Sequence, residues 1–148
     1  MALFTAFDIN ATGMTAERFR MDTISQNVAN ANTTRTEDGT PYRRKIVVFK
    51  EKNSPTHFHQ ILMKENERFA GNGVKVTGVY EDTKTEGNMV YDPSHPDADE
   101  NGYVMYPNVN IITEFTNLID ASRAYQANGT AFSASKNMAT MGLSILNS

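Results

Sequence analysis

Residues 1–32 read MALFTAFDINATGMTAERFRMDTISQNVANAN and contain no proline. Positions that recur in steps of four and three form a heptad-like seam, which is typical of paired helices. The seam consists of Leu3, Phe7, Asn10, Met14, Glu17, Met21, Ile24, Val28 and Ala31, seven of which are apolar. We expect a helix that ends near Asn30, because asparagine tolerates the left-handed conformation of a helix end. Thr12 and Gly13 interrupt the pattern, so a continuous helix and a broken one are both open.

Residues 108–146 return to this pattern at the other end of the chain. Asn110 is a good N-cap, and Glu114 falls in the first turn, where a negative charge favours the helix dipole. Eight of the eleven seam positions are apolar; the seam consists of Ile111, Phe115, Leu118, Ser122, Tyr125, Gly129, Phe132, Lys136, Ala139, Leu143 and Leu146. This helix would span roughly 55–60 Å, and the N-terminal helix roughly 40–45 Å.

The middle of the chain has a different character, because residues 33–106 contain four of the five prolines. Short runs rich in Val, Ile, Phe and Tyr predict strands at residues 45–49, 73–77, 79–80, 89–91 and 102–106. The predicted fold is therefore α+β, with long N- and C-terminal helices that pair as a coiled-coil-like layer and a small β-rich central module. We place the N-terminal helix of this layer in residues 1–34, the module in residues 35–106, and the C-terminal helix in residues 107–148.

Further apolar side chains lie off both seams and would stay exposed in a monomer. On the C-terminal helix they are Ile112, Ile119, Met138, Met141 and Ile145, and on the N-terminal helix they are Phe4, Ile9 and Phe19. Exposed apolar surface of this extent marks a binding face. A contact between copies that uses two different faces and does not close produces a helical array. The pattern alone leaves a second interpretation open, in which an ordinary helical hairpin packs on its own sheet.

Composition excludes several classes of function. The net charge of −3 and the pI of about 5.6 give no electrostatic footprint for nucleic acid. No apolar run approaches the ~20 residues that a membrane-spanning helix needs, so we expect no direct membrane insertion. The chain has no cysteine, and it shows no nucleophile elbow and no phosphate-binding glycine loop. We therefore predict that the protein is not an enzyme and has no cofactor.

Two patterns hint at a metal site, and neither is complete. Residues 97–102 match the first half of an EF-hand calcium loop, but its twelfth position is Asn108 where calcium binding needs a bidentate glutamate. His57 and His59 would share one face of a strand, with His95 as the remaining nitrogen ligand. We predict no metal site, and we interpret the loop as a proline-stiffened turn in which Asp92 and Ser94 form local hydrogen bonds.

Three segments carry a resemblance to a known family. Residues 23–34, TISQNVANANTT, with residues 13–18 as a lead-in, resemble the N-terminal signature shared by flagellar rod, hook and hook-associated proteins. Residues 118–128, LIDASRAYQAN, resemble the C-terminal helix of the same axial family. Residues 91–99, YDPSHPDAD, with 102–104 and 107–110, are similar to the proximal-rod proteins of this family in particular. The three segments cover about half of the chain, and departures are modest, at Gln26 and Thr113.

The resemblance implies a structural subunit of the proximal rod of the bacterial flagellar basal body. The terminal helices would assemble into a tubular drive shaft that transmits motor torque, with the middle module outside it. Implied partners are copies of the chain, other flagellar rod proteins and the flagellar type III export apparatus, through which the chain would pass without a cleaved signal peptide. Alternatives are another rod or hook axial protein, or a helical export adaptor or chaperone.

The implied assembly interface combines the seams with polar residues of the family-like segments. Its residues are Phe7, Met14, Met21, Ile24, Asn27, Val28, Asn30, Phe115, Leu118, Arg123, Tyr125, Phe132, Leu143 and Leu146. The loop signature consists of Asp92, Pro93, Ser94, His95, Pro96, Asp97 and Asp99. Two roles stay open for Asn27, Asn30 and Asn32, namely capping of helix-end carbonyls and hydrogen bonding between subunits.

Overall fold

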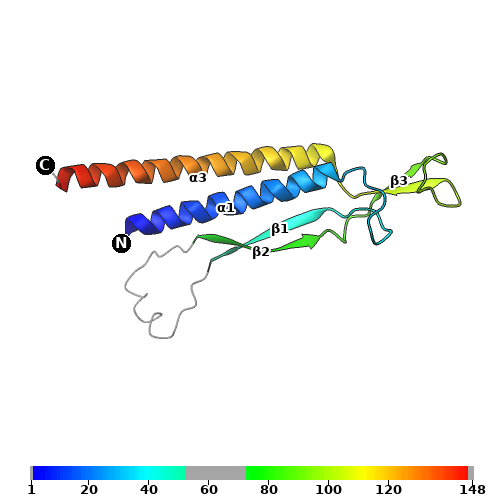
Figure 1. The fold of residues 1–148 in the computed structure, drawn as a ribbon, viewed down its shortest axis with the longest axis horizontal. Helices are drawn as coiled ribbons and strands as arrows, with labels where there is room; N and C mark the ends of the chain where they lie inside the picture. Colours follow the sequence, from blue (N-terminus) through cyan, green and yellow to red (C-terminus); the bar gives the residue numbers. More distant parts are fainter. Residues whose placement is uncertain (1, 53–72, 147–148) are drawn as a thin grey trace, which may run out of the picture. The chain divides into compact units, whose positions relative to one another are not determined.

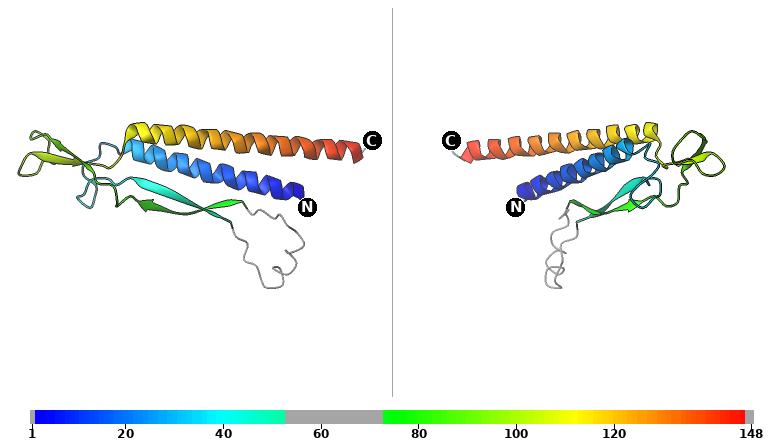
Figure 2. Two further views of the ribbon diagram at one scale, coloured as in Figure 1. Left: turned by 180° about the vertical axis from the view of Figure 1, so that it is seen from behind. Right: turned by 45° about the vertical axis from the view of Figure 1, so that its right-hand side comes forward.

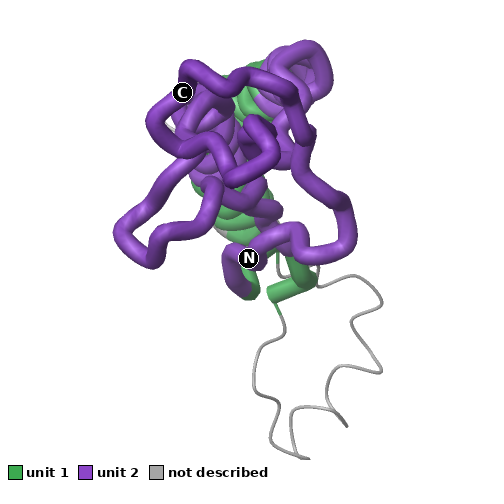
Figure 3. Tube along the Cα trace, turned by 90° about the vertical axis from the view of Figure 1, so that its right-hand side faces the viewer, with its two compact units in different colours: residues 1–18, 49–77, 122–148 green, residues 19–48, 78–121 purple. Residues whose placement is uncertain are grey.

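A computed structural model of the chain describes residues 2–52 and 73–146 (Figure 1). The described elements are two helices, α1 (Ala2–Ala29) and α3 (Ile111–Leu146), and four strands, β1 (Lys45–Glu51), β2 (Val74–Glu81), β3 (Asn88–Tyr91) and β4 (Tyr103–Tyr106). The α+β class and the long terminal helices predicted from the sequence are confirmed. The chain divides into two compact units, coloured separately in Figure 3. Unit 1 comprises Met1–Arg18, Phe49–Thr77 and Ser122–Ser148, and unit 2 comprises Phe19–Val48 and Gly78–Ala121.

In unit 1, the first half of α1 packs antiparallel against the second half of α3 (Figure 2). The rings of Phe7 and Phe132 meet edge-on with centroids 5.0 Å apart. One turn and a half further along, Gly13 lies so close to the side chain of Asn128 that an added Cβ would come within 2.9 Å of its Oδ1 atom. A glycine at this position therefore allows the two helices to approach each other closely.

Helix α1 runs unbroken through Thr12 and Gly13, so the break that these residues left open does not occur. The Thr12 hydroxyl donates to the Ile9 carbonyl at 2.7 Å and accepts the backbone N–H of Val74 at 3.2 Å. Thr12 thus fixes the first residue of β2 against the helix. Both residues that look like helix breakers in the sequence are contact points of unit 1.

The strands form two ribbons, β1–β2 and β3–β4. The Asp82 N–H donates to the Arg44 carbonyl at one end of the first ribbon, and the Lys52 N–H donates to the Gly73 carbonyl at the other, so β1 and β2 are antiparallel. Val79 and Tyr80, predicted as a separate strand, continue β2 without a break because the pairing with β1 extends over them. Strands β3 and β4 form an antiparallel hairpin in which Met89 pairs with Met105 and Tyr91 with Tyr103.

The buried apolar side chains of unit 2 are few and mostly small: Ile24, Ala31, Tyr42, Val104 and Ala121. Helix α1 ends at Ala29, close to the predicted end, and the chain turns through residues 30–32. The predicted reason is wrong, because no described residue other than glycine has a positive φ. The side-chain amide of Asn30 donates to the Gln26 carbonyl at 2.9 Å, and the same carbonyl accepts the Asn30 backbone N–H at 3.1 Å. A core of this size leaves much of the stability of unit 2 to polar contacts.

Gly73 offers a direct test of the contact between β2 and α1. Its φ of +75° is left-handed, and a Cβ there would collide with the Thr12 hydroxyl, whereas Gly39 has the same φ and open space around it. We predict that Gly73→Ala lowers the free energy of unfolding by more than the roughly 1–3 kcal/mol of backbone strain expected of Gly39→Ala. Chemical denaturation of both variants measures the difference, and equal losses would show that the Thr12 contact contributes nothing.

Candidate assembly interface

A buried polar cluster, here called the polar junction, joins three distant segments of unit 2: Asn27 of α1, Tyr42 and Arg44 ahead of β1, and Glu114 of α3. The Asn27 amide nitrogen donates to the Glu114 Oε2 atom and to the Lys45 carbonyl, both at 2.9 Å. The Asn27 Oδ1 atom accepts the Tyr42 hydroxyl and the Lys45 N–H, both at 2.9 Å. All four hydrogen-bonding positions of this side chain are therefore occupied.

Glu114 is 1% exposed and its carboxylate is held by a forked pair with Arg44. The Nε atom of Arg44 lies 2.8 Å and the NH2 atom 2.7 Å from the Glu114 Oε1 atom. A buried carboxylate is tolerated only when charged and polar donors replace the water it has lost. The sequence placed Glu114 in the first helical turn for its effect on the dipole, and it gave no local signal that Arg44 is the partner.

The segment that leads into α3 is fixed by Asn108 and Asn110. Asn108 accepts the Arg44 N–H at 2.8 Å and donates to the carbonyls of Asp82 and Thr85 at 2.9 and 3.0 Å. Asn110 accepts the N–H groups of residues 112 and 113 at 3.0 and 3.2 Å, which confirms it as the N-cap. Three groups therefore position the first turn of α3: the side chain of Asn108 just before it, the Asn110 cap and the side chain of Glu114.

Burial affects the acid–base behaviour of the polar junction. The pKa of Tyr42 is raised above its ordinary value of 10.0, first by burial and then by the negative charges of Glu114 and Glu81. A raised pKa keeps the Tyr42 hydroxyl protonated, which is the form that donates to Asn27.

In unit 2, the inward face of α3 combines a charged, a large apolar and a small side chain. Glu114, Leu118 and Ala121, spaced by four and three, share the face that is buried or half-buried within the chain. The face carrying Ile112, Phe115 and Ile119 is exposed, with Ile112 at 79% and Ile119 at 53%. An ordinary amphipathic helix would bury the larger apolar side chains.

In unit 1, the inward face likewise combines polar side chains with one large aromatic ring, and other large apolar side chains are exposed. Asn128, Phe132 and Ser135 share the face of α3 that lies toward α1. Met138, Met141 and Ile145, spaced by three and four, are exposed. We refer to Ile112, Phe115, Ile119, Met138, Met141 and Ile145 as the outward apolar residues of α3.

The residues predicted to form an interface take different positions. Ile24 and Asn27 are buried, and the half-buried residues are Phe7, Met14, Met21, Val28, Asn30, Leu118 and Phe132. The exposed residues are Phe115, Arg123, Tyr125 and Leu143, while the side chain of Leu146 lies outside the described part. The predicted seam of α3 therefore mixes both faces of the helix, because period-seven counting cannot tell which of two apolar faces points inward.

The loop signature connects β3 to β4 and is held by local hydrogen bonds. The Asp92 Oδ1 atom accepts the Ser94 hydroxyl at 2.6 Å and the Ser94 N–H at 3.1 Å, as expected from the sequence. These bonds lower the pKa of Asp92 below its ordinary value of 3.8, because they favour the ionised carboxylate. Asp99 accepts the N–H groups of Asn101 and Tyr103 at 2.9 and 2.8 Å. The loop is thus a compact turn between Pro93 and Gly102.

Asp97 anchors this loop to the segment that follows α1. Its Oδ2 atom accepts the Thr34 hydroxyl at 2.8 Å, and its Oδ1 atom lies 3.6 Å from Arg35. The Asp97 N–H donates to the His95 Nδ1 atom at 3.1 Å, and Pro96 between them is exposed. Because the chain continues from this loop into β4, the loop does not lead directly into α3; Pro107 to Asn110 do.

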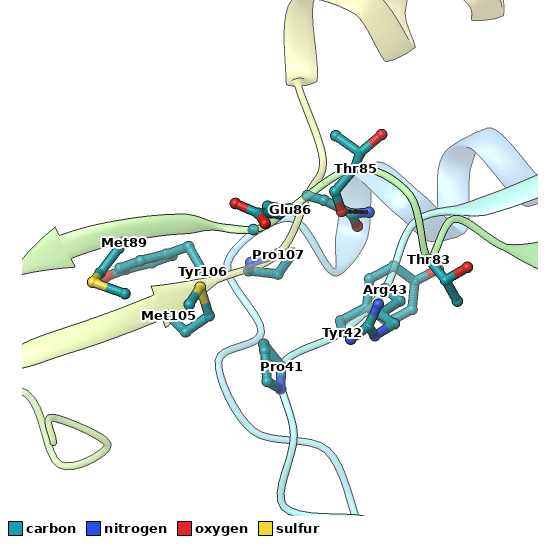
Figure 4. Close-up of a pocket in the computed structure, with 12 residues that line it drawn as sticks. Pro41, Tyr42, Arg43, Thr83, Thr85, Glu86, Met89, Met105, Tyr106 and Pro107 are labelled. Carbon is teal, nitrogen blue, oxygen red and sulfur yellow. Dashed lines mark hydrogen bonds between the residues drawn. The ribbon is translucent and has the colours of Figure 1, made fainter.

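A hollow of about 480 Å³ lies in unit 2 beside the polar junction (Figure 4). Met89, Met105 and Tyr106 of the hairpin line one side of it, and Tyr42 and Arg43 line another. The described residues contain no group of three or more His, Asp or Glu side chains arranged to hold a metal ion. His57 and His59, considered as a metal pair, lie outside the described residues. Neither α1 nor α3 is long and apolar enough to cross a membrane.

Comparison with known proteins identifies relatives that align with this chain over nearly all of its residues. Residues 7–35 match the family described as "Flagella basal body rod protein", and residues 100–145 match "Flagellar basal body rod FlgEFG protein C-terminal". The flagellar basal-body rod protein FlgC of Borreliella burgdorferi is 42% identical and aligns over 99% of each chain. FlgC of Bacillus subtilis is 41% identical over 98% of this chain and 99% of its own, and FlgC of Salmonella typhimurium is 39% identical over 93% of each.

We predict that Arg44→Met lowers the free energy of unfolding by about 3–5 kcal/mol, because it leaves Glu114 buried without its cation. Arg43→Met is the matched control, since Arg43 is exposed and adjacent, and it should stay within about 0.5 kcal/mol of the parent. Denaturant titration of the two variants measures both values. A similar small loss for both would mean that the Arg44–Glu114 pair does not stabilise unit 2.

A second prediction concerns alkaline pH. A group whose pKa is raised on folding stabilises the fold fully below its unfolded pKa, and this contribution is lost as pH rises through the folded value. Stability should therefore decline as pH increases beyond about 10, the ordinary pKa of Tyr42. Tyr42→Phe should remove this part of the decline and cost about 0.5–1.5 kcal/mol at neutral pH through the lost hydrogen bond. Thermal unfolding across pH 8–11 tests both effects, and an unchanged alkaline slope would contradict them.

Proposed function

We propose a mode of assembly for a chain that belongs to the FlgC family of flagellar basal-body rod proteins. As a member of this family it is a structural subunit of the rod of the bacterial flagellar basal body. The proposal is that neighbouring subunits bury the outward apolar residues of α3. The subunit then serves as part of the proximal rod, a tubular drive shaft that transmits motor torque.

One observation carries this proposal: α3 exposes six large apolar side chains, whereas its inward face buries Glu114, Ala121 and Ser135 beside the half-buried Leu118 and Phe132. Exposed apolar surface of this kind is a mark of protein–protein contact. Six large apolar side chains along one helix, each exposed, exceed the scattered surface residues that a monomer normally shows. Burial by neighbouring copies or other rod proteins removes them from water.

The length of α3 suits a load-bearing tube. A helix of 36 residues extends for roughly 54 Å, and it distributes its contacts over several neighbours. We propose that the axial layer consists of residues 1–34 and 107–148. Residues 35–106 would lie outside this layer. The predicted interface residues on α1, such as Met21 and Val28, would then complete the contacts around the axis.

The proposed partners are copies of this chain, other flagellar rod proteins and the flagellar type III export apparatus. Within the proposed role the side chains orient and pack, and none needs to carry out catalysis. The polar junction, which contains the most buried ionisable group of the described residues, is fully engaged in structural hydrogen bonds and is therefore proposed to act in positioning.

We predict that Ile119→Asp abolishes rod assembly while leaving the subunit folded. A charge at this position would be desolvated between subunits at a cost of several kcal/mol, whereas in the free chain the position is exposed. Complementation of a strain lacking its own subunit gene, read by soft-agar motility and by purification of basal bodies, measures the effect.

Thr113→Asp is the matched control, because Thr113 is exposed on the same helix but lies off the outward apolar residues. It introduces the same charge and should preserve motility. Normal rods with Ile119→Asp would show that this face of α3 stays in water after assembly.

A further inference from the structure

Helix α3 can in principle turn either of two faces toward its own chain. The face that is inward in unit 2 carries Glu114, Leu118 and Ala121, and the opposite face carries Ile112, Phe115 and Ile119. Burial of apolar surface favours turning the second face inward, because it removes more apolar area from water. A free subunit that rotated α3 in this way would conceal the surface that the proposed assembly requires.

The polar junction opposes this rotation. Glu114 accepts from Arg44 at 2.7 and 2.8 Å and from Asn27 at 2.9 Å, and these two donors are on separate segments. Rotating the helix would break all three contacts. The Arg44 guanidinium would lose its acceptor, and Asn27 would keep only one of its two acceptors, the Lys45 carbonyl. An unsatisfied buried polar group is costly, so the rotated state is disfavoured.

We infer that Glu114 is a positioning residue that sets the rotation of α3 about its own axis. Through Arg44 and Asn27, it keeps Ile112, Phe115 and Ile119 facing away from the rest of unit 2 before any neighbour is bound. This inference rests on the proposed function for the use of that exposed face, but the rotation itself is a property of the isolated subunit.

A buried polar cluster such as the polar junction can select one orientation of a helix without adding much to the free energy of unfolding. Replacing a buried ion pair by apolar residues of similar volume is often neutral or stabilising, while single polar groups in helical interfaces fix register. Replacing Glu114 and Arg44 together should therefore preserve folding and lose the fixed orientation. A double variant that folds but loses the fixed orientation of α3 distinguishes a positioning role from a purely structural one.

The test uses the absence of cysteine from the chain. Ile119→Cys places a single thiol on the outward face, and Ala121→Cys places one on the inward face, where Ala121 is fully buried. Both are made in the full chain and treated with a maleimide at a concentration where the subunit is monomeric. With the junction intact, the outward thiol should react at least about tenfold faster, because a protected thiol reacts only through local opening.

Each reporter is then combined with Glu114→Leu and Arg44→Met. We expect the ratio of the two rates to fall at least about tenfold, with the free energy of unfolding unchanged or increased. The control pair, Asp120→Leu with Arg123→Met, removes one acid and one base from exposed positions of the same helix and should leave the ratio unchanged. A folded junction variant that keeps the original ratio would overturn the inference.

Loss of folding in the double variant would also count against the inference, since the junction would then be a source of stability. Glu114→Gln provides the second measurement, because it keeps the side-chain shape and removes the charge. A fall in the ratio by a factor of about three or more supports a positioning role, since hydrogen bonds to a charged group are roughly twice as strong as neutral ones. An unchanged ratio overturns it.

The labelling involves no assembly, so its outcome is independent of the proposed function. If the labelling ratio falls in the double variant and normal rods still form, then Glu114 positions α3 as inferred and the exposed face is not the assembly surface. If labelling is unchanged and Ile119→Asp blocks assembly, the proposed function stands and the positioning role fails.

Discussion

The desolvated carboxylate of Glu114 constrains much of unit 2. A buried charge persists only where donors surround it, and here the donors come from α1 and from the segment ahead of β1. Asn27 and Arg44 supply these donors directly, and Tyr42 supports them by donating to Asn27. Asn108 holds the backbone of Arg44 and the carbonyls of Asp82 and Thr85. The first turns of α3 are thus attached to the rest of the unit by directional bonds, which a small apolar core could not supply.

The small side chains on the inward face have the complementary effect. Ala121 is fully buried in unit 2, and in unit 1 the absence of a side chain at Gly13 of α1 permits close approach to Asn128 of α3. The half-buried large apolar side chains of α3 are Leu118 in unit 2 and Phe132 in unit 1, and several others are exposed. Under the proposed function, folding and assembly would use different faces of the same helix.

Local patterns in the sequence predicted the elements well, because their causes are local. The Asn110 cap, the end of α1 near Asn30 and the alternating runs of β1 and β2 each depend on neighbouring residues. The Arg44–Glu114 pair joins residues 70 positions apart, and Glu114 already had an adequate local explanation as a partner of the helix dipole. Thr12 and Gly13 were ambiguous for the same reason, since their partners Val74 and Asn128 are remote.

A subunit whose proposed assembly face is already oriented would bind a neighbour more tightly than one that must first order this face. Ordering a helix and its side chains during association opposes binding, and an interface that is fixed beforehand avoids much of that cost. The same fixed orientation has a consequence for geometry: a contact between two different faces repeats with a constant rotation and extends as a helical array when that rotation does not close. A loosely rotating α3 would offer variable angles and therefore an irregular array. Under the proposed function, rigid attachment of the first turns of α3 through the polar junction would supply the constant angle that a regular rod requires.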